Sequence, residues 1–179
     1  ARLFDLLGLP REQVTLPASE LLRANSSAND DTAPLMPYRV EDLVWLGLSA
    51  PTVAVLTPYI TVLPVKTPVN LNTASAEVLY ASGAATDLAQ AQSLVDARRK
   101  AHFKTVRDAD KLVGSEQLST DDYAIASRFF EVRGRLRLEQ TVVEERSLVQ
   151  RDGTLVKTLW RERGAIPGLD AALSEALPR

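Results

Sequence analysis

Apolar residues in the first third of the chain recur at helical spacing, in short segments that end at proline or glycine. One cluster, at residues 3–7, is closed by Gly8, and a second, at residues 16–22, is interrupted at Pro17. Proline removes a backbone donor inside a helix, and glycine favours helix ends. The pattern therefore predicts several short helices here rather than one long helix, with a break at Pro17.

Residues 40–46 continue the helical spacing, and Gly47 is expected to end that helix. Trp45 lies within this segment, and we expect it to belong to the core. Residues 52–56 predict another short helix. Residues 60–65 are rich in β-branched side chains and bounded by prolines, which favours an extended segment.

Residues 69–114 have the pattern of a compact helical unit. Thr73 or Ser75 is expected to cap a helix that Gly83 stops, and Asp87 is expected to cap the next helix, which ends in the basic run 98–100. Residues 106–113 and 121–129 predict two more short helices, with Asp121 and Asp122 in the first turn of the second.

The pattern changes near Phe129 to strict alternation with period two. Apolar side chains (Val132, Leu136, Leu138) are predicted on one face of a strand and basic side chains (Arg133, Arg135, Arg137) on the other. Residues 141–149 and 155–162 predict two more strands, joined by a hairpin at Asp152-Gly153. A three-stranded antiparallel sheet buries little by itself, so we expect a helix to cover its apolar face.

The predicted fold class is therefore α+β, with helices first and a sheet last. We expect a helical domain at residues 1–126, a three-stranded antiparallel sheet at 127–164 and a C-terminal tail at 165–179.

Composition excludes several kinds of chemistry. The chain has 179 residues, no cysteine and one histidine, His102, so disulfides, thiolate metal sites and multi-histidine sites are ruled out. Four carboxylates stand close in sequence (Asp108, Asp110, Asp121, Asp122), but their spacing brings no acid, base and nucleophile together. We therefore expect no catalytic residues and no enzymatic activity.

Net charge and hydropathy restrict the kinds of partner that we expect the chain to bind. Net charge is −2, with 11 Lys/Arg against 15 Asp/Glu in residues 1–126 (−4) and 10 against 8 in residues 127–179 (+2). Neither part has the basic excess typical of a phosphate-backbone binder. The chain starts at Ala1 and has no apolar run of the roughly 20 residues that span a bilayer. We expect a fragment whose targeting segment lies upstream.

Three segments together resemble a known family. They are 37–43, then 58–64 followed by Pro68-Val69-Asn70-Leu71-Asn72-Thr73-Ala74 and its helix, then the sheet from Phe129. In this order they resemble protein K of the type II secretion system, a minor pseudopilin, over residues 35–164.

The resemblance implies a pilin-like fold with a large helical domain inserted. It also implies an N-terminal helix, absent from this chain, that anchors the protein in the inner membrane of a Gram-negative bacterium and packs on the sheet. The chain would then be a periplasmic domain. Its expected partners are minor pseudopilins I and J, with which it would form the pseudopilus tip that initiates or caps assembly for protein export.

The sequence differs from the resembled family at an acidic loop that binds calcium in that family. The run typical of the family is missing here, and Asp30 and Asp31 are the only acidic pair in the loop. Calcium takes six to eight oxygen ligands, so we favour a solvated loop, with these two aspartates as the candidate calcium ligands and no other cofactor.

Two further alternatives remain open. The 69–114 unit also resembles a helix-hairpin-helix module, which binds nucleic acid through a hairpin at a helix N-terminus. Here the hairpin is Gly83-Ala84-Ala85-Thr86-Asp87, with one glycine and an acid where an anion would bind, so we favour a packed scaffold. The second alternative is partner contact through Trp160, Arg133, Arg135 and Arg137, against a solvated sheet face.

Overall fold

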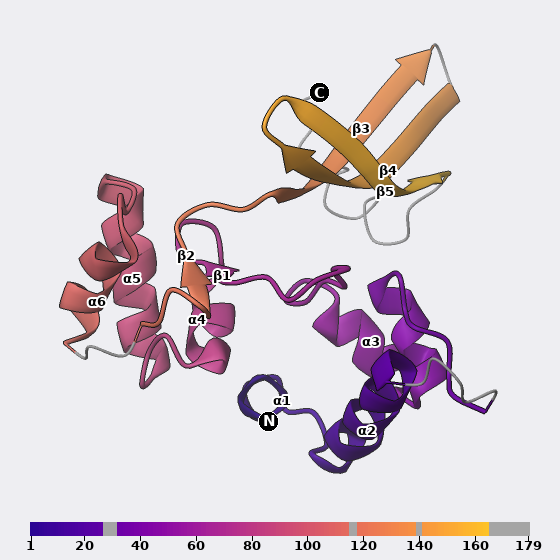
Figure 1. Cartoon of the computed structure of the whole chain (residues 1–179), viewed down its shortest axis with the longest axis horizontal. Helices are drawn as coiled ribbons and strands as arrows, with labels where there is room; N and C mark the ends of the chain where they lie inside the picture. Colours follow the sequence, from indigo (N-terminus) through magenta and orange to yellow (C-terminus); the bar gives the residue numbers. More distant parts are fainter. Residues whose placement is uncertain (27–31, 115–117, 139–140, 165–179) are drawn as a thin grey trace, which may run out of the picture. The chain divides into compact units, whose positions relative to one another are not determined.

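The computed structural model describes residues 1–26, 32–114, 118–138 and 141–164. Helices occupy the earlier part of the chain and an antiparallel sheet the last part (Figure 1). The fold is α+β, as predicted. The chain divides into two compact units, Ala1–Ala126 and a second unit that begins at Ser127. The tail predicted at 165–179 lies outside the described residues.

The first unit is built from short helices and one small parallel strand pair. In chain order these are α1 (Arg2–Leu6), α2 (Glu12–Ser26), the 3-10 helix η1 (Val40–Leu46), α3 (Ala50–Leu56), β1 (Val69–Asn70), α4 (Ala76–Ser82), α5 (Leu88–Lys100), α6 (Val106–Val113) and β2 (Tyr123–Ala124). β1 pairs with β2 in parallel. This pairing places the first residues of the 69–125 segment beside its last residues.

Helix ends follow the predicted signals. Ser75 and Asp87 are the N-caps of α4 and α5, and each side chain accepts a hydrogen bond from the backbone N–H three residues on. Gly83 ends α4 with a φ of 93°, a left-handed conformation that a side chain would strain. The predicted α4, α5 and α6 are therefore confirmed.

Other predictions in this unit are wrong. α2 runs through Pro17, although proline cannot donate the backbone bond to the carbonyl of Gln13. Trp45 is not in the core: it is 53% exposed, because η1 buries Val40, Asp42 and Leu46 instead.

The helix predicted at 121–129 does not form. Tyr123 and Ala124 make β2, held by two backbone hydrogen bonds: the N–H of Val69 donates to the carbonyl of Asp122, and the N–H of Leu71 donates to that of Ala124 (both 2.8 Å). Extended backbone places Tyr123 in the core, and this long-range pairing overrides the local acidic helix-start signal.

Two apolar clusters lie inside the first unit. The larger one is formed by α4, α5, α6 and the strand pair, with Leu71, Leu79, Leu94 and Phe103 among its buried members. The smaller one joins η1 and α3 to partly buried residues of α1, around Val53 and Leu56.

The second unit is a sheet of three strands in sequential order, β3 (Phe129–Leu138), β4 (Thr141–Asp152) and β5 (Leu155–Arg163). The β3–β4 register pairs Val132 with Ser147 and Leu136 with Val143. β4 and β5 are joined by the predicted hairpin, where Gly153 has a φ of 60°. A register shift at Leu148/Val149 marks a bulge in the β4–β5 pairing.

Cross-strand pairing divides the side chains between two faces. One, here called the apolar face, carries Phe130, Val132, Leu136, Val143 and Val156. The other, here called the charged face, carries Arg133, Arg135, Glu144, Arg146, Leu148, Trp160 and Glu162. The alternation predicted for β3 is confirmed, but the apolar face is not a core: Val132 is 51% and Leu136 70% exposed.

Candidate functional site

The predicted arginine row lies on the charged face, where carboxylates neutralise it. Arg135 Nε lies 3.4 Å from Glu144 Oε1, and Arg133 forms an ion pair with Glu131. The Glu144 side chain is only 9% exposed. Removing Arg135 would therefore leave a nearly buried carboxylate with less compensation, which is costly. The row is part of a charge network rather than a bare basic stripe.

Trp160 lies on the same face, beneath an arginine that sequence reasoning missed. The guanidinium of Arg146 stacks over the Trp160 ring, 5.2 Å from its centroid, and Arg146 Nη2 lies 3.3 Å from Glu162. The Arg146 side chain is 10% exposed. The structure thus brings Trp160 onto the face that carries the arginine row. The period-two alternation of residues 142–150 could have placed Arg146 there.

A second charge cluster lies within the apolar face, where Glu145 pairs with Gly134 between Val132 and Leu136. Glu145 accepts from Arg163 at 2.6 Å and lies 3.1 Å from Arg161. The hydrogen bond from Arg163 holds the pKa of the Glu145 carboxyl below its ordinary value, against a smaller opposing effect of desolvation. Charged side chains therefore interrupt the exposed apolar side chains of this face, and such a mixture is typical of binding surfaces.

In the first unit, the side chain of Asn72 ties together three distant segments. Its Nδ2 donates to the carbonyls of Phe103 and Ile125, both at 3.0 Å, and its Oδ1 accepts from the N–H of Phe103 at 2.9 Å. Arg98 adds a bond of 2.8 Å to the carbonyl of Leu71, and partial burial lowers the pKa of Arg98. The Asn-Leu-Asn motif is thus explained by packing within the unit.

The α4–α5 turn differs from a phosphate-binding hairpin in its chemistry. Asp87 accepts from the N–H of Gln90 at 2.8 Å, and the Gln90 side chain accepts from the N–H of Thr86 at 2.8 Å. Ala84 and Ala85 are buried. Two of the backbone donors that a phosphate would use are already satisfied, and the nearest acid would repel it.

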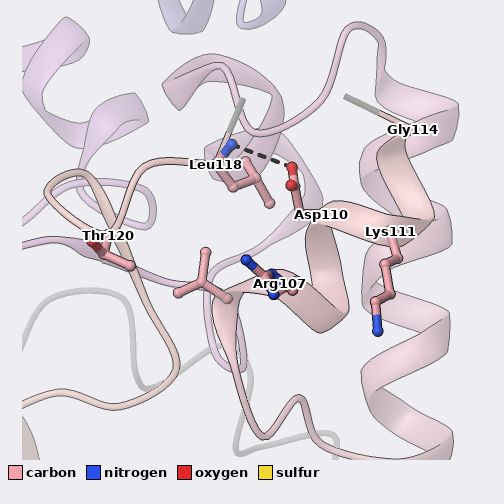
Figure 2. Close-up of a pocket in the computed structure, with 7 residues that line it drawn as sticks. Arg107, Asp110, Lys111, Gly114, Leu118 and Thr120 are labelled. Carbon is pink, nitrogen blue, oxygen red and sulfur yellow. Dashed lines mark hydrogen bonds between the residues drawn. The ribbon is translucent and has the colours of Figure 1, made fainter. Parts of the chain in front are cut away.

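A cavity of about 760 Å³ opens beside α6 (Figure 2). Its described lining comes from α6 and from the chain that follows: Val106, Arg107, Asp110, Lys111, Gly114, Leu118 and Thr120. Asp110 Oδ1 accepts from the N–H of Leu118 at 3.3 Å, the dashed line in Figure 2. Arg107 and Lys111 are both exposed, and in Figure 2 their side chains point in different directions.

The carboxylates and the histidine considered from the sequence form local contacts or are exposed. Asp108 accepts from the N–H groups of Lys104 and Thr105, and these bonds lower the pKa of its carboxyl. Asp122 pairs with Lys66 at 3.0 Å. His102 is exposed. These positions bring no nucleophile and base together.

Within the described ranges, no group of three or more His, Cys, Asp or Glu side chains is arranged to hold a metal ion. Asp30 and Asp31, the candidate calcium ligands, lie outside the described residues. In the same part of the chain, none of the helices has the length and apolar character needed to cross a membrane.

Comparisons with known proteins bear on both units. Residues 69–129 match the family described as type II secretion system (T2SS), protein K. Type II secretion system protein K of Pseudomonas aeruginosa is 33% identical over 156 residues, which cover 86% of this chain and 41% of that protein. The predicted resemblance to this family is confirmed. The chain spans about two fifths of the length of this relative.

Proposed function

Because the resemblance to type II secretion protein K is confirmed, we propose that this chain is part of a minor pseudopilin that acts in protein export. Its role is docking rather than catalysis. The observation that carries the proposal is the exposed apolar face of the three-stranded sheet, which in a pilin-like protein is covered by an N-terminal helix.

The dimensions of the sheet suit a single helix. Neighbouring strands lie about 4.8 Å apart, so three strands present a width of about 10 Å. A helix with its side chains has a diameter of about 10 Å. Leu136 is 70% and Val156 62% exposed. Burying a side chain of this kind fully gains about 1.5–3 kcal/mol, so several together favour covering this face.

The residue order supports a pilin-like scaffold carrying a helical insertion. In this arrangement the sheet is the pilin part, and the first unit is the inserted helical domain. Within the first unit, β1 and β2 bring residues 69–70 beside residues 123–124, so the helices α4, α5 and α6 form a substructure whose two ends are adjacent.

The family resemblance supports a proposal for the role in the assembled pseudopilus. The protein joins minor pseudopilins I and J at the tip of the pseudopilus, on the periplasmic side of the inner membrane. The helical domain caps the fibre and leaves no surface for a further subunit above it. Membrane attachment comes from a helix outside this chain.

The test is co-elution on a sizing column of this chain with the helix-free domains of pseudopilins I and J from the same organism. The proposal predicts one peak that contains all three proteins in equal amounts. If the three elute separately, and still do so when the upstream helix of each is restored in detergent, the tip assignment is wrong.

A further inference from the structure

A row across the apolar face differs from the apolar side chains beside it. The strand register places Gly134 of β3, Glu145 of β4 and Arg163 of β5 side by side. In the described part of the chain, no atom lies within 4 Å of the position that a Cβ of Gly134 would take. Along β3, Val132 and Leu136 flank this position and are 51% and 70% exposed. The face therefore has an opening between two exposed apolar side chains.

The backbone conformation does not require glycine at this opening. Gly134 lies inside β3, and it is not among the glycines with a positive φ. Glycine weakens a strand interior, and it often marks a place where a ligand or another backbone comes close. The opening therefore suits a side chain from a segment that packs on this face.

Beside the opening, two guanidiniums share one carboxylate. Arg161 Nε lies 3.1 Å from Glu145 Oε1, and Arg163 Nε lies 2.6 Å from Glu145 Oε2. The two arginine side chains are 50% and 65% exposed. A guanidinium has five N–H donors, and these contacts use the Nε of each, so both arginines can bind a further carboxylate. The cluster has one cation more than it has acids.

The three strands do not supply a second carboxylate to this face. Among their described side chains that share it, the one other charged group is Arg151, whose guanidinium lies over the Phe130 ring, 5.2 Å from its centroid. The strand residues whose side chains are not described, Leu138 and Thr141, carry no charge. A segment that covers the cluster would therefore bury an excess cation, which is costly unless the segment brings its own acid.

The segment that fits is the upstream helix of the proposed function, on which this inference rests. The relative from Pseudomonas aeruginosa has chain for it, since the matched segment is 41% of that protein. We propose that this helix carries a large apolar side chain that packs over Gly134 and, within two helical turns of it, a carboxylate that binds Arg161 and Arg163. The spacing follows from the sheet, because β3 and β5 lie about 10 Å apart and two turns of helix rise about 11 Å.

Thiol labelling measures whether the face is covered. Because the chain has no cysteine, Leu136→Cys places a single thiol on the apolar face and Leu155→Cys places one on the charged face. Each is made in this chain and in the full-length protein in detergent, with any upstream cysteine changed to serine, and is labelled with a water-soluble maleimide. The Leu136→Cys thiol should react at least about tenfold more slowly in the full-length protein, because an apolar contact protects it. The Leu155→Cys thiol should react equally fast in both.

Gly134→Leu tests the apolar contact through the Leu136→Cys thiol of the full-length protein. The added side chain fills the opening, so it should displace the helix and speed labelling at least about threefold. The sheet itself has room for it, since a Cβ at this position meets no described atom within 4 Å. Circular dichroism of this chain should therefore be unchanged by Gly134→Leu.

The triple variant Glu145→Gln/Arg161→Gln/Arg163→Gln tests the carboxylate. It neutralises the cluster without leaving an unpaired charge in the sheet, so a helix without an acid would cover the face at least as well as before. A helix with the proposed carboxylate loses its partners, and labelling should speed up at least about threefold. Lys157→Gln removes an exposed cation of β5 on the charged face and should leave the rate unchanged.

The outcomes separate this inference from the proposed function. Equal labelling of the Leu136→Cys thiol in the two proteins would mean that no helix covers the face, which contradicts both. Slow labelling in the full-length protein that neither Gly134→Leu nor the triple variant changes would leave the covering in place and overturn the inference alone. Slow labelling already in this chain would mean that another of its segments covers the face, which also overturns the inference.

Discussion

Asn72 is a position where a single substitution should strongly destabilise the first unit. Its side chain makes three hydrogen bonds, to the N–H and carbonyl of Phe103 and to the carbonyl of Ile125. These partners lie 31 and 53 residues further along the chain. Asn72→Ala removes all three bonds together.

The magnitude follows from the groups left behind. A backbone donor or acceptor left unsatisfied in a buried site costs about 1–3 kcal/mol. Phe103 is buried and Ile125 partly buried. For each of the three backbone groups we therefore take about 1 kcal/mol, the lower end of this range. Three such groups give about 3 kcal/mol. Asn72→Asp keeps the acceptor but places oxygen against two carbonyls, so we expect a loss at least as large.

Urea unfolding followed by far-ultraviolet circular dichroism measures this effect, because the described helices all lie in the first unit. With a slope of about 2 kcal/mol per molar urea, Asn72→Ala should lower the midpoint by about 1.5 M. Asn25→Ala, on the exposed side of α2, is the control and should change stability by less than about 0.5 kcal/mol. An unchanged midpoint for Asn72→Ala would refute the reasoning that Asn72 holds these segments together.

Two further predictions concern the N-cap of α5 and the ion pair of Glu145 with Arg163. Asp87→Ala removes the N-cap of α5, whose carboxylate accepts a hydrogen bond from the N–H of Gln90 at 2.8 Å. In urea unfolding it should lower the free energy of unfolding by about 1 kcal/mol. A loss below about 0.2 kcal/mol would contradict the assigned cap. Glu145 has a pKa below its ordinary value of 4.5 because Arg163 donates to it, so its stabilising effect on the sheet is complete above about pH 4.5 and is lost as pH falls through the lowered pKa. The unfolding temperature of the sheet should therefore fall on acidification, and Glu145→Gln should make it less dependent on pH. An identical pH profile for both proteins would disprove a stabilising role of the Glu145 carboxylate.

Local signals in the sequence were sufficient for most helices and all three strands of the sheet. Ser75, Asp87 and Gly83 mark helix ends through bonds and dihedral angles that involve only near neighbours, so they are readable without tertiary information. The alternation from Phe129 places each side chain on its face because a strand has period two.

Long-range contacts account for the failures. β2 depends on pairing with β1, more than 50 residues earlier, and no local pattern around Tyr123 predicts it. Trp45 was expected in the core because it lies in the apolar segment 40–46, but η1 is a 3-10 helix in which Val40, Leu43 and Leu46 share one row. Trp45 lies outside this row and is 53% exposed.

For the candidate surfaces too, local sequence signals predict some residues, whereas others depend on long-range pairing. The arginine row and Trp160 could be named from the sequence, but the carboxylates that neutralise the row, and Arg146 stacked on Trp160, required the register of β4 with its two neighbours. The cavity beside α6 was missed, because it depends on where residues 118–120 return to the helix.

The most direct test of the central claim is a secretion assay in the source organism. Deletion of the gene should abolish export of type II substrates into the medium, and the complete wild-type gene should restore it. Leu136→Asp charges the apolar face, whereas Leu155→Asp is a matched change, 75% exposed against 70%, on the opposite side of the sheet. The account predicts that Leu155→Asp restores export and Leu136→Asp, expressed at the same level, does not. Full export with Leu136→Asp, or unimpaired export in the deletion strain, would contradict it.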